Sequence, residues 1–396
     1  TQLTTHFWVI GTTGAGKTSF IMTLIEKQAQ QGGGVIFVDG KSDVKMFFKL
    51  YNIMKRVGRE HDVYVINFLP VEEFRMHTNT FNPIANMPAN LVVEFLASLM
   101  GDASGDHAYW QGRGKALLSP VVKILHYRKK YNGENYTIST IADTLSSFDR
   151  LSFLFAMCYA MTLNMEKELS SNIQLQALYE KASLRKAKHP TFPYIDAFDY
   201  HLKTVPTDLY LFAQLERRYT FEQIEELYTA YKEAIRFVSE ISNDWFSYVE
   251  KLAYAFLKEI GEPLKARFED YVRVYERAKE IIKFDTTRYT TALQQLAYAQ
   301  QQWTEIMTAL NSYANIFGST EPEIDMVDVI RNQKILYVLL PPLKQSKSTT
   351  ALLGKLIVRS IAQAVSTALG EALHGITDEQ REVLTARLTP IPLGLV

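Results

Sequence analysis

Cysteine is almost absent from this sequence, with one residue, Cys158, in 396. A disulfide within the chain is therefore excluded, and such scarcity is typical of a reducing compartment. Cys158 lies in the apolar run LFAMCYAM, where we expect a buried packing residue and not a nucleophile.

Charge of either sign is not in excess, because 43 Lys and Arg residues balance 43 Asp and Glu residues. A net charge of zero argues against a protein that binds nucleic acid over its whole surface by charge. It does not argue against a local basic loop. The eight histidines include no His-x-x-x-His pair, so no metal site of familiar spacing is predicted.

Long apolar runs and a secretory signal are also lacking, since no run approaches the roughly 18 residues of a membrane-spanning helix. The chain as given is predicted to be soluble. Its length indicates two or three domains, and its 47% hydrophobic content allows sizeable cores. Because it opens on the strand-like HFWVI and stops in PIPLGLV, we expect a fragment of a longer protein.

The two ends of the chain alternate short apolar runs with helical patterns. In residues 1–84 the runs HFWVI, VIFVDG and VYVINF predict strands, with helices at 19–31 and 44–57 between them. In residues 319–396 QKILYVLLPP predicts a buried strand, followed by a helix and the start of another strand, PIPLGLV. This pattern predicts an α/β fold with a mostly parallel sheet.

Residues 85–318 have a helical period instead and predict an all-α domain inserted into the α/β domain. Apolar residues at spacings of three or four predict one helix from Ala234 to Ile260, which Gly261 ends. Another helix is predicted to start after Asp285, as its N-cap, and to run to Gly318.

The stretch GTTGAGKT fits the phosphate-loop pattern Gly-x-x-x-x-Gly-Lys-Ser/Thr. Its glycines let backbone N–H groups point inward at phosphates, at the start of a helix. The pattern predicts an ATP site formed by Gly11, Thr12, Thr13, Gly14, Ala15, Gly16, Lys17, Thr18 and Ser19. Lys17 is expected to bind the β- and γ-phosphates, and the Thr18 hydroxyl to ligate Mg²⁺.

Polar residues follow the predicted strand VIFVDG. Asp39, Lys41 and Asp43 come just after its carboxyl end, where open α/β sheets bind ligands. A plain polar turn is one interpretation; an acid near Mg²⁺ or a lysine facing the nucleotide is the other. Asp39 is therefore a candidate metal ligand and a weak candidate for the catalytic acid.

An acid at the end of a neighbouring strand is also required for hydrolysis. No apolar strand in the sequence ends in Asp-Glu, and the best candidate strand, PIPLGLV, is where the chain stops. We therefore expect the catalytic acid beyond Val396. Arg113, Arg359 and Arg387 are all candidates for an arginine finger, and nothing in the sequence decides between them.

These motifs, in this order, resemble the type IV coupling proteins, the TraD/TraG family of secretion ATPases. Besides the phosphate loop, VDGKSD is similar to the family's Asp-Pro-Lys-Gly-Asp/Glu segment, with Gly40 and Ser42 departing from it. FNPI is similar to its Asn-Pro-Leu turn and YWQGRGKALL to its aromatic–Ala–Leu-Leu helix. LYVLLPPLKQSKSTTALLGKLIVRSI is similar to its strand–Leu-Pro–Ser–helix block.

The resemblance implies a RecA-like P-loop core that binds ATP and Mg²⁺, assembled as a homo-hexamer. It also implies a place at the cytoplasmic face of the bacterial inner membrane, with a membrane segment preceding this fragment. The implied partners are secretion subunits and adaptors, with protein effectors or relaxase-bound DNA as cargo. By this resemblance the full-length assembly is an ATPase and the isolated fragment is not.

Two other functions stay open at this point. A DNA-pumping ATPase of the HerA/FtsK kind shares the core architecture, and neutral charge and the large helical region speak weakly against it. The second is a scaffold that binds nucleotide but hydrolyses little of it. It stays open because no catalytic acid is identified in this sequence.

Overall fold

The fold was analysed in a computed structural model of the chain. The structure describes residues 9–12, 14–69, 77–101, 104–170, 221–261, 266–281, 289–341, 345–373 and 394–395. Thr13 and Arg387, named above as candidate site residues, lie outside these ranges, as does most of PIPLGLV.

A parallel sheet forms the centre of the α/β part, as the sequence predicts. The strands in the described residues are β1 (Val35–Asp39), β2 (Val63–Asn67), β3 (Ile335–Leu339) and β4 (Gly394–Leu395). Their order is β2-β3-β1-β4, and every pair is parallel. β3 thus lies between two strands from the start of the chain, which unites the two predicted α/β segments in one sheet.

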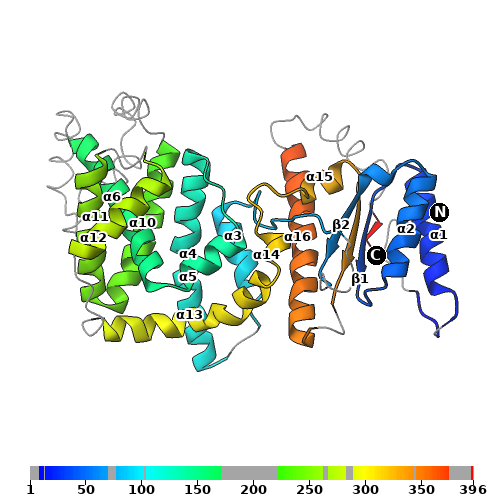
Figure 1. Ribbon diagram of the computed structural model, residues 1–396, viewed down its shortest axis with the longest axis horizontal. Coiled ribbons are helices and arrows are strands. Elements are labelled where there is room, and N and C mark those ends of the chain that lie inside the picture. The colour runs from blue at the N-terminus through cyan, green and yellow to red at the C-terminus, as the bar shows by residue number, and fades with distance from the viewer. Residues whose placement is uncertain are drawn as a thin grey trace.

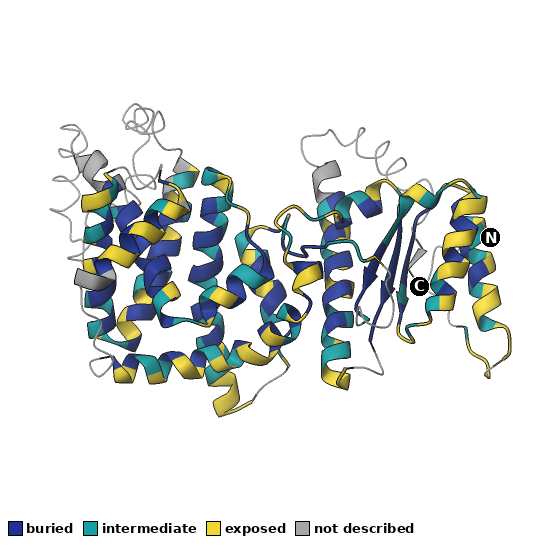
Figure 2. Ribbon diagram, in the orientation of Figure 1, coloured by how far each residue is buried: buried dark blue, intermediate teal, exposed yellow. Residues whose placement is uncertain are grey.

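Helices cover both faces of this sheet (Figure 1). α1 (Lys17–Gln30) and α2 (Val44–Arg56) lie on one face, and α16 (Lys347–Leu373) lies on the other. Strand alternation explains the division, because successive side chains point to opposite faces. Phe37 and Tyr337 pack with α1 and α2, whereas Ile36 belongs to the core that includes α16. The strands are accordingly buried between two helical layers (Figure 2).

Between β2 and β3 the regular elements among the described residues are helices, apart from one isolated β-bridge between Phe81 and Ile324. These helices are α3 (Ala89–Ala97), α4 (Asp106–Asn132), α5 (Ile138–Leu145), α6 (Phe148–Ser170), α10 (Phe221–Ile241), α11 (Asn243–Ile260), α12 (Phe268–Ile281), α13 (Thr290–Asn311), α14 (Ala314–Phe317) and α15 (Met326–Arg331). Most of them gather beside α16, on its side away from the sheet (Figure 1). Cys158 is fully buried in α6, which confirms its predicted packing role, and burial raises the pKa of its thiol.

The predicted single helix from Ala234 to Ile260 is wrong, because the chain breaks at Ser242 into α10 and α11. Ser242 has extended backbone angles (φ −166°, ψ 131°), and its hydroxyl accepts hydrogen bonds from the N–H groups of Asp244 and Trp245. Apolar spacing missed the break because Ile241 and Trp245 are four residues apart and both buried. The N-cap serine was the signal in the sequence.

We predict that Ser242→Ala lowers the free energy of unfolding by about 1 kcal/mol, because two N–H groups of α11 lose their acceptor. Urea denaturation followed by circular dichroism measures the change. Ser239→Ala is the matched control, since Ser239 is exposed and its hydroxyl donates to the Arg236 carbonyl of its own helix. Equal effects of the two substitutions would contradict the capping role.

Two further boundaries differ from the sequence prediction. α13 begins at Thr290 with Tyr289 in the N-cap position and ends at Asn311, before the short α14; the predicted cap, Asp285, lies outside the described residues. In the predicted strand HFWVI, only Val9 and Ile10 are described, and they have irregular structure.

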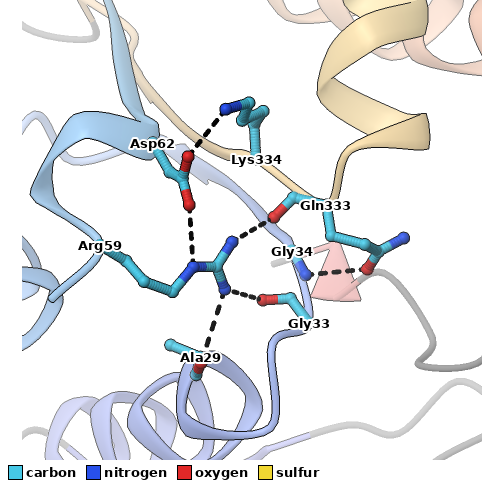
Figure 3. A network of polar contacts seen from close by, with 7 residues as sticks. All are labelled: Ala29, Gly33, Gly34, Arg59, Asp62, Gln333 and Lys334. Carbon is cyan, nitrogen blue, oxygen red and sulfur yellow. Dashed lines mark hydrogen bonds and ion pairs between the residues drawn. The ribbon is translucent and has the colours of Figure 1, made fainter. Parts of the chain in front are cut away.

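Arg59 joins the loops that precede three strands (Figure 3). Its guanidinium donates to the carbonyls of Gly33, before β1, and Gln333, before β3, at 2.7 and 2.5 Å. It also donates to Asp62 at 3.0 Å, and Lys334 donates to the other oxygen of Asp62 at 2.7 Å. This cluster ties together the amino ends of β1, β2 and β3.

Candidate functional site

The predicted phosphate loop leads directly into α1. Gly14 and Gly16 have φ of 84° and 83°, in the left-handed region that glycine adopts at little cost. Gly16 is the N-cap of α1 and supplies no side-chain acceptor. The N–H groups of the first turn of a helix have no partner within the helix, and they carry its positive dipole end. The start of α1 is therefore built to receive an anion.

Lys17 crosses this loop. Its ammonium donates to the carbonyls of Gly11 and Thr12, the latter at 2.6 Å. Gly11, Thr12, Gly14, Ala15, Gly16, Thr18 and Ser19 are all exposed. The structure thus brings the described members of the predicted phosphate loop together at one accessible turn. The Lys17 ammonium and the N–H groups of the first turn of α1 lie at this turn, where they could bind phosphates.

The phosphate loop and the carboxyl end of β1 lie at the same end of the sheet. α1 runs back along the sheet to the amino end of β1, so the start of α1 lies at the same end of the sheet as the carboxyl end of β1 (Figure 1). Ligands of open α/β sheets bind outside the carboxyl ends of the strands. The phosphate loop and the Asp39 segment therefore lie at the same end of the sheet, and their joint role in binding a nucleotide stays a prediction.

Asp39 is 7% exposed, and its carboxylate organises the loop that follows β1. One oxygen accepts from the N–H groups of Lys41 and Ser42 at 2.8 and 3.1 Å. The other accepts from the N–H of Asp43 at 2.7 Å and from the Tyr337 hydroxyl at 3.0 Å. The role of Asp39 toward Mg²⁺ or in catalysis stays a prediction, while its role in the loop is directly visible.

Tyr337 on β3 is a site residue that the sequence did not reveal. Burial and the charge of Asp39 raise the pKa of its phenol, so the hydroxyl remains protonated and donates at neutral pH. Its ring stacks on Phe37 at 5.0 Å and meets Phe47 edge-on at 5.3 Å. Only the register of β1 against β3 places it beside Asp39.

The segment after Asp39 explains one departure from the coupling-protein pattern. Ser42 stands where that pattern has glycine, and its φ is 58°, in the left-handed region. A hydrogen bond from the Ser42 hydroxyl to the Leu340 carbonyl supports this conformation. Asp43 then caps α2 by accepting from the N–H groups of Lys45 and Met46. The loop keeps a glycine-like shape without the glycine.

The arginine candidates differ in their surroundings. Arg113 is paired with Glu240 at 2.8 Å and lies over the Phe237 ring, so a structural role accounts for it. Arg359 is exposed on α16. In the part of the chain that the structure describes, no cluster of three or more His, Cys, Asp or Glu side chains is arranged to hold a metal. None of its helices is both long and apolar enough to cross a membrane.

A parallel sheet with a phosphate loop leading into the first helix defines a P-loop protein of the α/β class. The sequence profile of the family described as "Helicase HerA, central domain" matches residues 1–184. The chain is also 24% identical, over 401 aligned positions, to the type 4 coupling protein DotL of Legionella pneumophila subsp. pneumophila. That alignment covers 99% of this chain and 39% of DotL, so the chain spans well under half the length of this relative. This similarity confirms the resemblance to the type IV coupling proteins.

Proposed function

We propose that this chain is the ATPase domain of a type IV coupling protein, which couples ATP binding and hydrolysis to substrate delivery into a secretion channel. The observation that carries the proposal is the exposed phosphate loop with Lys17 at the start of α1. The similarity to DotL over nearly the whole chain supports the coupling-protein class.

The residues of the loop fit the nucleotide that this function requires. The first-turn N–H groups and the Lys17 ammonium would hold the phosphates, and the exposed Thr18 hydroxyl would ligate Mg²⁺. Bound Mg²⁺ neutralises charge on the phosphates and so eases transfer of the terminal phosphoryl group. The catalytic acid and the cation from a neighbouring subunit belong to the assembled protein in this proposal.

The domain division and the assembly are part of the same proposal. Residues 1–84 and 319–396 would form the nucleotide-binding domain, and the inserted residues 85–318 would meet adaptors or cargo. The sheet order supports this division, since β3 lies between β1 and β2. The full-length protein is proposed to act as a hexamer at the cytoplasmic face of the inner membrane.

A secretion assay with the full-length protein tests this function. Complementation of a deletion strain with the Lys17→Ala variant should leave the protein at the inner membrane but stop export. Fractionation controls for localisation, and Lys27→Ala controls for loss of an exposed charge on α1. Normal export by Lys17→Ala would refute the proposal.

The match to the HerA central domain favours one second candidate, a DNA-translocating ATPase. Hydrolysis by the full-length protein that rises strongly with double-stranded DNA, together with measured translocation, would support this alternative. Hydrolysis unchanged by DNA would leave the coupling function as the better account.

A further inference from the structure

The loop of residues 40–43 has a fixed shape, and it lies at the phosphate-binding end of the sheet. It connects β1 to α2, which packs on the same face of the sheet as α1. Asp39, Phe37 and Tyr337 also point to that face, because alternate residues of a strand share a side. The loop and the phosphate loop are therefore on the same edge and the same face.

The Asp39 carboxylate has its hydrogen-bonding capacity filled by the protein itself. A carboxylate offers about four lone-pair positions, and Asp39 has four donors between 2.7 and 3.1 Å. Three of them are consecutive backbone N–H groups, which curl around the carboxylate as such groups curl around an anion. To ligate Mg²⁺ as well, Asp39 would have to give up one of these bonds.

Lys41 is held in this loop by its backbone while its side chain is exposed. Its N–H donates to Asp39 at 2.8 Å. Its ammonium makes no ion pair with any residue that the structure describes. This lysine lies on a loop fixed by hydrogen bonds, at the same end and on the same face of the sheet as the phosphate-binding turn. A lysine ammonium in such a position can act as a point charge for phosphate.

We infer that Lys41 is a second cation for the phosphates of the nucleotide and that Asp39 is the positioning residue that holds its loop. This inference rests on the proposed nucleotide binding. It gives Asp39 a role through its four hydrogen bonds and leaves Mg²⁺ to Thr18 and the phosphates.

Nucleotide affinity of the 396-residue chain tests the inference, measured by isothermal titration with ATP in the presence and absence of Mg²⁺. Lys41→Gln should weaken binding roughly tenfold in both conditions, since a hydrogen bond to a charged group is lost. Lys41→Arg should keep affinity within about threefold, because the charge remains. Lys49→Ala, an exposed lysine on α2, is the control and should change affinity less than about twofold.

Asp39→Asn completes a double-mutant cycle with Lys41→Gln. If Asp39 acts through Lys41, the double variant should bind no more weakly than Lys41→Gln alone. If instead Asp39→Asn weakens only Mg·ATP binding and leaves Mg²⁺-free ATP unchanged, Asp39 is a metal ligand and its positioning role is refuted. Should Asp39→Asn fail to fold, as judged by circular dichroism, the comparison of Lys41→Gln with Lys41→Arg decides the role of Lys41.

Lys17→Ala separates failure of this inference from failure of the proposed function. Loss of binding in Lys17→Ala, with Lys41→Gln no weaker than Lys49→Ala, would overturn the inference alone. Unchanged binding in Lys17→Ala would overturn the proposed nucleotide site itself.

Discussion

Lys17→Ala is expected to weaken Mg·ATP binding by roughly 100-fold or more. The Lys17 ammonium now bonds to two carbonyls of its own loop, and phosphate oxygens are stronger acceptors because they are charged. Each hydrogen bond to a charged group contributes about 1.5–3 kcal/mol, and 1.4 kcal/mol corresponds to tenfold in affinity. Loss of two such bonds therefore exceeds 100-fold. Isothermal titration of the 396-residue chain measures the effect.

Lys27→Ala is the matched control for this change. Lys27 is exposed in the last turn of α1, far from the phosphate loop, and donates to Gln30 at 3.5 Å. Its removal should leave affinity within about twofold, since charges beyond a Debye length are screened. Equal affinities of the Lys17 and Lys27 variants would contradict the phosphate-loop assignment. Hydrolysis by the unsubstituted 396-residue chain as a monomer should be negligible, because a cation supplied by a neighbouring subunit can contribute on the order of 10³ or more to the rate.

The second large effect concerns stability. Arg59→Ala should lower the free energy of unfolding by about 2–4 kcal/mol, because the carbonyls of Ala29, Gly33 and Gln333 and one carboxylate oxygen of Asp62 lose this donor in a half-buried site. The Arg59 side chain is 14% exposed, and its partners precede three different strands (Figure 3). Urea denaturation followed by circular dichroism measures the change.

Arg56→Ala provides the comparison for Arg59. Arg56 is paired with Glu26 at 2.9 Å, but its side chain is 63% exposed, and exposed pairs contribute about 0–1 kcal/mol. The two variants remove the same side chain three residues apart. A cost for Arg59→Ala as small as that for Arg56→Ala would show that the cluster does not hold the strands together.

The same cluster predicts how stability depends on pH. Partial burial alone would raise the pKa of Asp62, but hydrogen bonds from Lys334 and Arg59 outweigh it and lower the pKa below its ordinary value. The bond to Asp62 correspondingly raises the pKa of Lys334. The contribution of Asp62 is therefore complete above the ordinary carboxyl pKa, near pH 4, and is lost as pH falls further. Arg59→Ala should reduce this acid-dependent loss, which urea midpoints between pH 3 and 7 would reveal.

Local sequence determined the elements that position the site. The apolar runs VIFVDG, VYVINF and QKILYVLLPP became β1, β2 and β3, and the glycine-rich turn leads into α1, which begins at Lys17, two residues before the predicted start. These predictions succeeded because a buried strand and a glycine-rich turn at a helix start are specified by neighbouring residues. The prediction of a single helix from Ala234 to Ile260 was wrong because apolar spacing indicates only which residues are buried. Buried residues four apart, Ile241 and Trp245, continue that spacing across the break at Ser242.

Tertiary structure alone decided which distant residues meet. Tyr337 bonds to Asp39, and Gln333 bonds to Arg59, only because β3 enters the sheet between β1 and β2. Strand order depends on how two helical layers are buried against both faces at once, and no short stretch of sequence encodes it. The phosphate-loop pattern could therefore be predicted from the sequence. The hydrogen bond from Tyr337 to Asp39, by contrast, depends on the register of β1 against β3.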